Sequence, residues 1–200
     1  MTARLAVLAS GRGSNLKAVL DACASGDIDA SVVCVVSDNP NASALIRAEE
    51  AGVDRVFALP RRTEPTIDRR SWDSSLADAV AESEPDWVVL AGFMRLLSGA
   101  FLDRFPQRVI NLHPALPGEF PGLNAIERAF AEFKADTRTA SGVMVHLVPD
   151  EGVDDGPVLA TASVAFRAGD TLPGFAARMH AAEHSLLIST LAKLVQEVSA

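Results

Sequence analysis

The sequence predicts one α/β domain over residues 1–200, with a doubly wound, mostly parallel sheet that has helices on both faces. Two observations support this prediction. Several short runs are apolar throughout, which is typical of strands buried on both faces of a sheet. These runs alternate with helical patterns, and such an alternation implies right-handed crossovers between parallel strands. We expect a Rossmann-like N-terminal half and a single hydrophobic core, since 200 residues suit one core.

The first predicted strands and helices alternate regularly. An apolar run over 4–9 ends at a glycine-rich turn, and a helical pattern begins near Ser14. A β-branched run over 31–37 is the second strand, because it stops at an Asp-Asn-Pro turn signal. A short helix over 42–52 ends at a glycine, and a short strand follows near 54–58.

The middle of the chain continues this order. Two prolines predict a loop over 61–68, and a helical pattern follows over 69–83. Apolar runs over 87–91 and 108–113 are typical of further buried strands. The remaining helix, two strands and long terminal helix are expected over 123–134, 141–149, 157–166 and 172–196.

The composition excludes several classes of function. A formal net charge of −8 argues against a nucleic-acid partner, because binding to phosphate backbones needs a concentrated basic face. No segment approaches a membrane span, and the N-terminal apolar run is too short for a secretory signal. Cys23 and Cys34 indicate neither a disulfide framework nor a zinc site. We expect a cytoplasmic protein that acts on small molecules, as a monomer or homodimer.

Polar, glycine-rich or proline-rich segments follow three of the predicted strands. They are Ser10–Asn15, Gly92–Arg95 and His113–Gly122. In a doubly wound sheet the ligand crevice lies beyond the carboxyl ends of the strands. The functional site is therefore expected at this edge of the sheet.

The segment SGRGSN over 10–15 predicts a phosphate site. Glycines let backbone N–H groups turn inward, and the start of the following helix adds a partial positive charge. A dinucleotide fingerprint needs a third glycine where Leu16 stands, so Asp38 is only weak support for a ribose site. The Gly-Lys-Ser/Thr of a triphosphate P-loop does not occur either. A monophosphate site remains, with helix capping by Ser14 as the alternative.

Asn111 and His113 are two residues apart on a predicted strand, so both side chains leave the same face near its carboxyl end. An amide and an imidazole can donate to one developing oxyanion, and histidine can also move a proton. The acidic turn over 149–157 is the candidate source of a carboxylate that would raise the pKa of His113. A solvated acidic loop is the alternative. Covalent acyl transfer is not indicated, because no serine elbow or cysteine nucleophile lies nearby.

Four segments together resemble the folate-dependent formyltransferases, and among them the phosphoribosylglycinamide formyltransferases of purine synthesis. The segments are GRGSN over 11–15, LAGFMRLL over 90–97, INLHP over 110–114 and GVDDGP over 152–157. The similarity covers essentially the whole chain. Asn-x-His-Pro with a later Val-Asp-x-Gly-Pro is specific to folate formyl-transfer domains as a group, whereas the Gly-Ser-Asn loop and the short length point to this member.

The resemblance implies transfer of the formyl group of 10-formyltetrahydrofolate to the amine of 5-phosphoribosylglycinamide (GAR), with no metal. It also implies that Asn111, His113 and Asp154 form the catalytic group. The GAR-binding residues implied are Gly13, Ser14, Asn15, His180, Ala181, Ala182 and Glu183. The folate-binding residues implied are Arg69, Met94, Arg95, Leu96, Leu97, Asn111, Asp150, Glu151, Gly152, Val153 and Asp154.

The chain departs from the family pattern at two places. Family members commonly read HPSLLP where this chain has HPALPG over 113–118, so the loop after the histidine is expected to run differently. Asp155 stands where a threonine or glycine is frequent. We choose Asp154 as the catalytic acid because it fits Val-Asp-x-Gly-Pro.

Three further histidines have structural interpretations. His180 and His184 fit the H-x-x-E-H pattern of some zinc peptidases, but a third ligand is not evident after them. Helix packing with a substrate contact from Glu183 is the preferred interpretation. His146 lies inside an apolar strand and is expected to be a satisfied core histidine, with support of the catalytic group as the alternative.

Other functions remain as alternatives. A methionyl-tRNA formyltransferase normally carries a C-terminal tRNA domain, and a formyltetrahydrofolate hydrolase usually carries an N-terminal regulatory domain. Neither extra domain is expected in an acidic chain of 200 residues. A nicotinamide-binding module would need the third glycine, and a non-catalytic sugar-phosphate binder would tolerate loss of His113.

Overall fold

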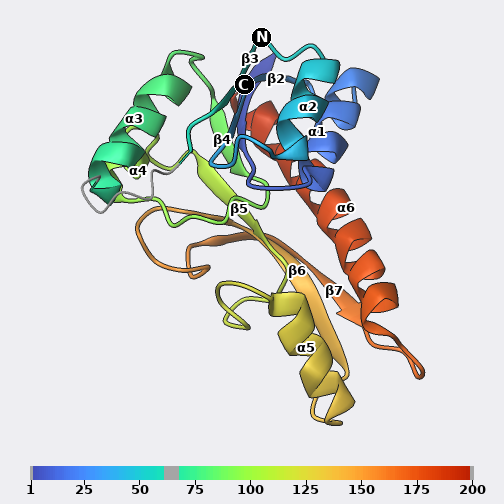
Figure 1. Cartoon of the computed structure of the whole chain (residues 1–200). Helices are drawn as coiled ribbons and strands as arrows, with labels where there is room; N and C mark the ends of the chain where they lie inside the picture. Colours follow the sequence, from blue (N-terminus) through green and yellow to red (C-terminus); the bar gives the residue numbers. More distant parts are fainter. Residues whose placement is uncertain (1, 61–67, 199–200) are drawn as a thin grey trace.

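A computed structural model describes residues 2–60 and 68–198 (Figure 1). Its strands are β1 (Ala3–Leu8), β2 (Ala30–Ser37), β3 (Arg55–Ala58), β4 (Trp87–Leu90), β5 (Val109–His113), β6 (Ala140–Leu147) and β7 (Val158–Ala165). Its helices are α1 (Ser14–Ser25), α2 (Ser43–Glu50), α3 (Arg69–Ala81), α4 (Gly99–Leu102), α5 (Ala125–Lys134) and α6 (Leu172–Val198). The loop predicted over 61–68 lies outside the described residues except for Asp68, which precedes α3.

The seven strands form one sheet in the order β3-β2-β1-β4-β5-β6-β7. Strands β1 to β5 pair in parallel, whereas β6 is antiparallel to β5 and β7 is antiparallel to β6. The predicted doubly wound, mostly parallel sheet is confirmed. The sequence pattern did not distinguish the antiparallel end, because β6 is buried on both faces like the parallel strands.

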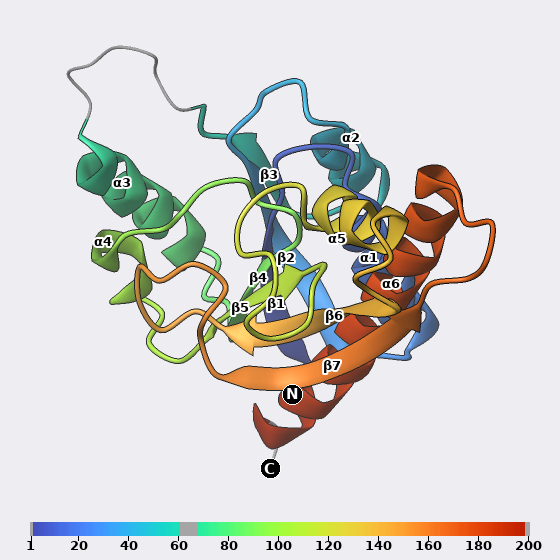
Figure 2. The same cartoon turned by 90° about the horizontal axis from the view of Figure 1, so that it is seen from below.

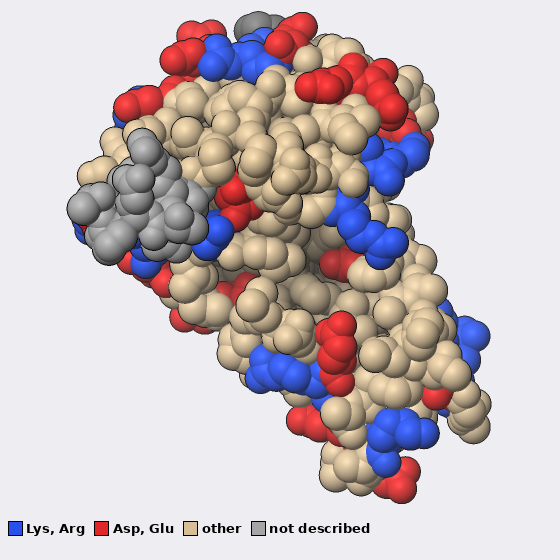
Figure 3. All heavy atoms as spheres, in the orientation of Figure 1, with Lys and Arg blue, Asp and Glu red and all other residues tan. Residues whose placement is uncertain are grey.

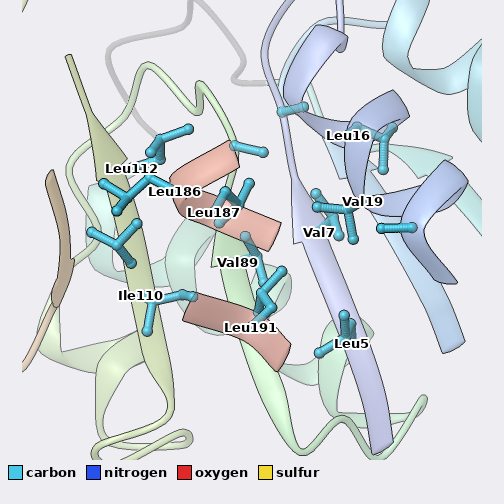
Figure 4. Packing of buried hydrophobic residues seen from close by; sticks show 14 of the residues in the cluster. Leu5, Val7, Leu16, Val19, Val89, Ile110, Leu112, Leu186, Leu187 and Leu191 are labelled. Atoms are coloured by element: carbon cyan, nitrogen blue, oxygen red, sulfur yellow. The ribbon is translucent and has the colours of Figure 1, made fainter. Parts of the chain in front are cut away.

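Helices cover both faces of the sheet, as predicted (Figure 2). Alternate residues of β1 enter different cores, because successive side chains of a strand point to opposite faces. Leu5 and Val7 pack with α1, α2 and α6, and Figure 4 shows Val7 beside Val19. Ala6 and Leu8 pack with α3 and α4 on the other face. The sheet is thus the middle of three layers.

Two local features differ from the pattern-based prediction or extend it. Helix α4 was not predicted, since four residues are too few to show a helical period. Strands β6 and β7 extend past the body of the protein together with α5 (Figure 1). Among residues 2–60 and 68–198, no helix is long and apolar enough to cross a bilayer.

Candidate active site

The Asn-His pair lies at the carboxyl end of β5, as the sequence predicts. The side-chain amide of Asn111 donates from Nδ2 to Oδ1 of Asp154, at 2.9 Å. Nδ1 of His113 lies 3.2 Å from Oδ2 of the same carboxylate. One carboxylate from a remote turn therefore binds both members of the pair. The alternative of a solvated acidic loop is wrong for Asp154, whose side chain is 12% exposed.

The backbone of the turn around Asp154 directs this side chain toward Asn111 and His113. The residue has a φ of 54°, a left-handed conformation that aspartate tolerates better than most side chains. The backbone N–H of Gly122 donates to Oδ2 at 2.8 Å, which fixes the carboxylate from the loop after β5. A Cβ on Gly156 would lie 2.0 Å from the carbonyl oxygen of Leu147, so only glycine fits this close approach to β6. Asp155, the neighbouring acid, is exposed.

His146 joins the same group from β6, where it lies directly opposite Asn111 in the antiparallel pair. Its Nδ1 is 2.8 Å from the carbonyl oxygen of Leu147, and a carbonyl can only accept, so Nδ1 carries the proton. Nε2 is then an acceptor for Nδ2 of Asn111, at 3.1 Å. His146 is 2% exposed, so it is a buried core histidine, and it also contacts Asn111 of the Asn-His pair.

Burial controls the charge state of His113. Desolvation lowers the pKa of His113, and it outweighs the nearby charge of Asp154, which acts in the opposite direction. The expectation that the carboxylate raises this pKa is therefore wrong for the net effect. Burial tends to raise the pKa of Asp154, but the contact with His146, the N–H of Gly122 and the proximity of the His113 ring lower it overall. A neutral imidazole beside an ionised carboxylate is the favoured state near neutrality.

A neutral His113 has one distinct tautomer in this setting. Nδ1 faces the Asp154 carboxylate and carries the proton, since a carboxylate only accepts. Nε2 is buried, and it has no hydrogen-bond partner among the residues that the structure describes. Nε2 is therefore unpaired among these residues, and the backbone of Glu119 and Phe120 also acts on the ring, where it raises the pKa of His113 against the larger effect of burial.

A cavity of about 450 Å³ adjoins this group, a volume in the range typical of small-molecule sites. Among the predicted folate residues it is lined by Met94, Arg95, Leu96, Leu97, Asn111, Asp150, Gly152, Val153 and Asp154. Lining residues that the sequence analysis did not select include Phe93, Val148 and the segment 122–125. The last of these follows β5 in a loop whose course no periodic pattern reveals. Figure 3 shows the hollowed face of the molecule.

Arg69 and Glu151 do not line this cavity, although both were predicted to bind folate. They lie together beside it: Nη2 of Arg69 is 3.2 Å from Oε2 of Glu151. Asp73, which is 1% exposed, lies 3.7 Å from Nε of the same arginine and accepts the N–H of Ser98 at 2.7 Å. These ion pairs connect the start of α3 to the acidic turn and to the segment after β4.

The glycine loop approaches α2 closely at Gly13. This residue is the N-cap of α1, with a φ of 72°, and a Cβ on it would lie 2.8 Å from Cα of Ala44. Helix α1 begins at Ser14 without a side-chain capping bond, so the alternative that Ser14 caps the helix is wrong. Oδ1 of Asn15 is buried and has no partner among the described residues. The loop therefore leaves polar groups available at the start of α1.

The segment 180–183 of α6 lies close enough to the glycine loop for the charge of Arg12 to act on His180. Nδ1 of His180 is 2.6 Å from Oε2 of Glu183, and this contact raises the pKa of the histidine. The charge of Arg12, in the glycine loop, acts on the same histidine in the opposite direction. Over 2–60 and 68–198, no three His, Cys, Asp or Glu side chains gather as metal ligands would. The residues predicted to bind GAR do not line the 450 Å³ cavity.

Comparison with known proteins decides the family. Residues 3–191 match the family model described as formyl transferase. The chain belongs to the formyl transferase family. The phosphoribosylglycinamide formyltransferase of Dictyostelium discoideum is 39% identical over 201 residues, which cover 96% of this chain and 97% of that protein. The enzyme of the same name from Mycobacterium tuberculosis strain H37Rv is 44% identical over 192 residues, covering 96% of this chain and 85% of that protein.

Solved structures of this formyl transferase family agree with the fold described above. Glycinamide ribonucleotide transformylase 1 from Symbiobacterium toebii has a TM-score of 0.89 and 37% identity, covering 98% of this chain and 89% of that one. Phosphoribosylglycinamide formyltransferase from Bacillus halodurans has a TM-score of 0.88 and 33% identity, with coverage of 98% and 96%. The similarity thus spans both the parallel and the antiparallel parts of the sheet.

Proposed function

We propose that this formyl transferase transfers the formyl group of 10-formyltetrahydrofolate to the amine of GAR, in the de novo synthesis of purines (IMP). The observation that carries the proposal is the buried, unpaired Nε2 of His113, whose Nδ1 contacts the Asp154 carboxylate beside a cavity of small-molecule size. The family membership and the relatives named phosphoribosylglycinamide formyltransferase support the substrate pair. Both substrates are small molecules, and the proposed reaction needs no metal.

The reaction proposed is a direct attack. The amine nitrogen of GAR forms a bond to the formyl carbon, and the carbonyl electron pair moves onto the oxygen. Nε2 of His113, an acceptor in the neutral ring, takes the proton that the amine loses. The imidazolium that results is stabilised by Asp154 at 3.2 Å. When the tetrahedral intermediate collapses, N10 of the folate leaves and takes this proton.

Asn111 supplies a donor to the developing oxyanion. In the structure its two amide protons face Asp154 and His146, at 2.9 and 3.1 Å. Donation to the oxyanion exchanges the neutral contact to His146 for a charge-assisted one, which is the stronger kind. Holding both reactants at one site contributes further, because effective molarities of about 10⁵–10⁸ M are reached in well-oriented systems.

The substrates are assigned to the two parts of the sheet edge. The folate pterin is proposed to occupy the cavity lined by the segment 94–97 and by the turn over 150–154, with Arg69 beside it. The phosphate of GAR is proposed to lie against Gly13, Ser14 and Asn15. The segment from His180 to Glu183 then faces the sugar or the glycinamide.

The pH dependence follows from the lowered pKa of His113. Because burial disfavours the imidazolium, the free enzyme keeps a neutral, active base down to a pH below 6.5, the ordinary value for histidine. We expect an NMR titration to place the His113 midpoint below 6.5, and the acid limb of kcat/KM to follow it. The signal is assigned by its loss in His113→Ala. A midpoint above the ordinary value would contradict the proposed base.

Shortening the phosphate loop side chains tests the GAR assignment. We expect Ser14→Ala and Asn15→Ala each to raise the KM for GAR by about tenfold, as for loss of one hydrogen bond to a charged group. The kcat and the KM for the folate should change little, since neither side chain belongs to the catalytic group. Steady-state kinetics with each substrate varied in turn measures this. An unchanged KM for GAR would place the phosphate elsewhere.

One assay separates the transferase from a formyltetrahydrofolate hydrolase. Purified protein is mixed with 10-formyltetrahydrofolate, and the folate absorbance is followed with and without GAR. Folate turnover only when the amine is present supports the transferase. Turnover without GAR would show a hydrolase, and no turnover in either mixture would favour a non-catalytic binder.

A further inference from the structure

The winding of the sheet reverses between β1 and β4. From β1 the chain continues to β2 and β3 on one side, and β4 then returns to the other side of β1. The segment after β1 leads into α1 on one face of the sheet, whereas the segment after β4 leads into α4 on the opposite face. The two segments diverge at their common edge, which is where such sheets open a ligand crevice.

Side-chain contacts connect the diverging segments across this point. The N–H of Ser10 donates to the carbonyl of Gly92 at 3.1 Å, which continues the backbone pairing of β1 with β4. Oγ of Ser10 accepts the N–H of Met94 at 2.8 Å. One residue further, Nε of Arg95 donates to Oδ2 of Asp38 at 2.6 Å. The Asp38 side chain is only 6% exposed, so this ion pair is well shielded on the carboxylate side.

The Ser10 contacts join the parts of the site assigned to different substrates, whereas Asp38, which follows β2, holds the folate segment from a third strand. Under the proposed function, the segment 13–15 holds the phosphate of GAR and the segment 94–97 lines the folate cavity. Their separation therefore sets the distance between the attacking amine and the formyl carbon. A near-attack arrangement needs reacting atoms about 3–3.5 Å apart, so a displacement of one ångström is costly.

We propose that Ser10 and Asp38 are positioning residues: Ser10 holds the folate segment in register with the phosphate loop, and Asp38 fixes the same segment from the end of β2. This inference rests on the proposed function, and it adds two residues that contact neither reacting group. Ser10 acts through the N–H of Met94, and Asp38 acts through the guanidinium of Arg95. The sequence pattern alone makes Asp38 only weak support for a ribose site.

The serine offers a clean test, because its two contacts are separable. Ser10→Ala removes the hydroxyl acceptor but keeps the backbone N–H that bonds to Gly92. Met94 is exposed, so water can replace the lost acceptor and the stability of the fold should change little. A purely structural role would instead appear as a lower melting temperature with unchanged kinetics.

We expect Ser10→Ala to raise the KM for the folate about fivefold to tenfold and to lower kcat by a similar factor, consistent with loss of one positioning hydrogen bond. The KM for GAR should stay within twofold. Ser10→Thr keeps an acceptor oxygen and should recover most of the loss. Ser25→Ala is the matched control, since that hydroxyl bonds to the carbonyl of Ala22 at the far end of α1. Asp38→Ala is expected to affect the folate KM in the same direction.

A second measurement tests the hydrogen bond between Ser10 and Met94 without an activity assay. Hydrogen exchange of a peptide that contains Met94 should be faster in Ser10→Ala than in the wild type, and unchanged in Ser25→Ala. Wild-type folate kinetics together with unchanged exchange in Ser10→Ala would overturn the inference. Faster exchange with unchanged folate kinetics would also overturn it, because the contact would then not position the substrate. If the wild type itself transfers no formyl group, the proposed function fails, and only the exchange result reports on the contact.

Discussion

Replacement of His113 by alanine is expected to lower kcat by about 10²–10⁴-fold, the usual contribution of a general base. The KM values should change much less, because the imidazole acts on the proton that moves during the reaction and not on the binding of either substrate. Rapid-mixing single-turnover kinetics with purified variant measures the chemical step directly. Binding of each substrate alone, followed by calorimetry, provides the comparison.

Chemical rescue separates lost chemistry from lost structure. Added imidazole should restore part of the His113→Ala activity, since the truncated side chain leaves space beside Asp154. A general loss of folding would not respond to imidazole. Near-normal turnover in the unrescued variant would refute the assignment of His113 as the base.

Asp154→Asn is expected to have the second-largest effect, a loss of about 10²–10³-fold in kcat. The change removes the charge that stabilises the imidazolium but keeps the side-chain size. Asparagine also tolerates a left-handed backbone, so a φ of 54° adds little strain in the variant. Asp155→Asn is the matched control: it neutralises an exposed acid in the same turn and should leave kcat near the wild-type value.

The same variant makes an independent prediction about charge. The carboxylate of Asp154 opposes the effect of burial on His113, so its neutralisation should lower the pKa of His113 further. An NMR titration of the variant detects this shift without any turnover. A kcat close to that of Asp155→Asn, or a His113 pKa that rises, would show that the carboxylate does not act on the imidazole.

Much of the fold could be predicted because its signals are local. Fully apolar runs indicate buried strands, and the spacing of Asn111 and His113 fixes their common face from the sequence alone. The antiparallel direction of β6 could not be predicted, because a buried strand has the same composition in either direction. Local sequence therefore indicates which segments are strands, but it does not indicate that β6 is antiparallel to β5.

Those site residues that belong to a recognisable sequence motif could be predicted. Asp154 follows from the Val-Asp-x-Gly-Pro pattern, and the structure places it against His113. The N–H of Gly122 that also holds this carboxylate comes from an irregular loop, so no periodic signal identifies it. The direction of the His113 pKa was mispredicted because it depends on how deeply the ring is buried, and burial is a property of the assembled layers.

The contact between the glycine loop and α2 ties two distant positions into one steric unit. The backbone of Gly13 passes so close to Ala44 that a single added carbon would overlap it, while the N–H of Ala44 bonds to the carbonyl of Gly11. Nε of Arg47, one turn along α2, holds the carbonyl of Arg12 at 2.9 Å. Helix α2 thus fixes the shape of the glycine loop. A larger side chain at position 13 would therefore require a change in α2 as well, because its Cβ would overlap Ala44.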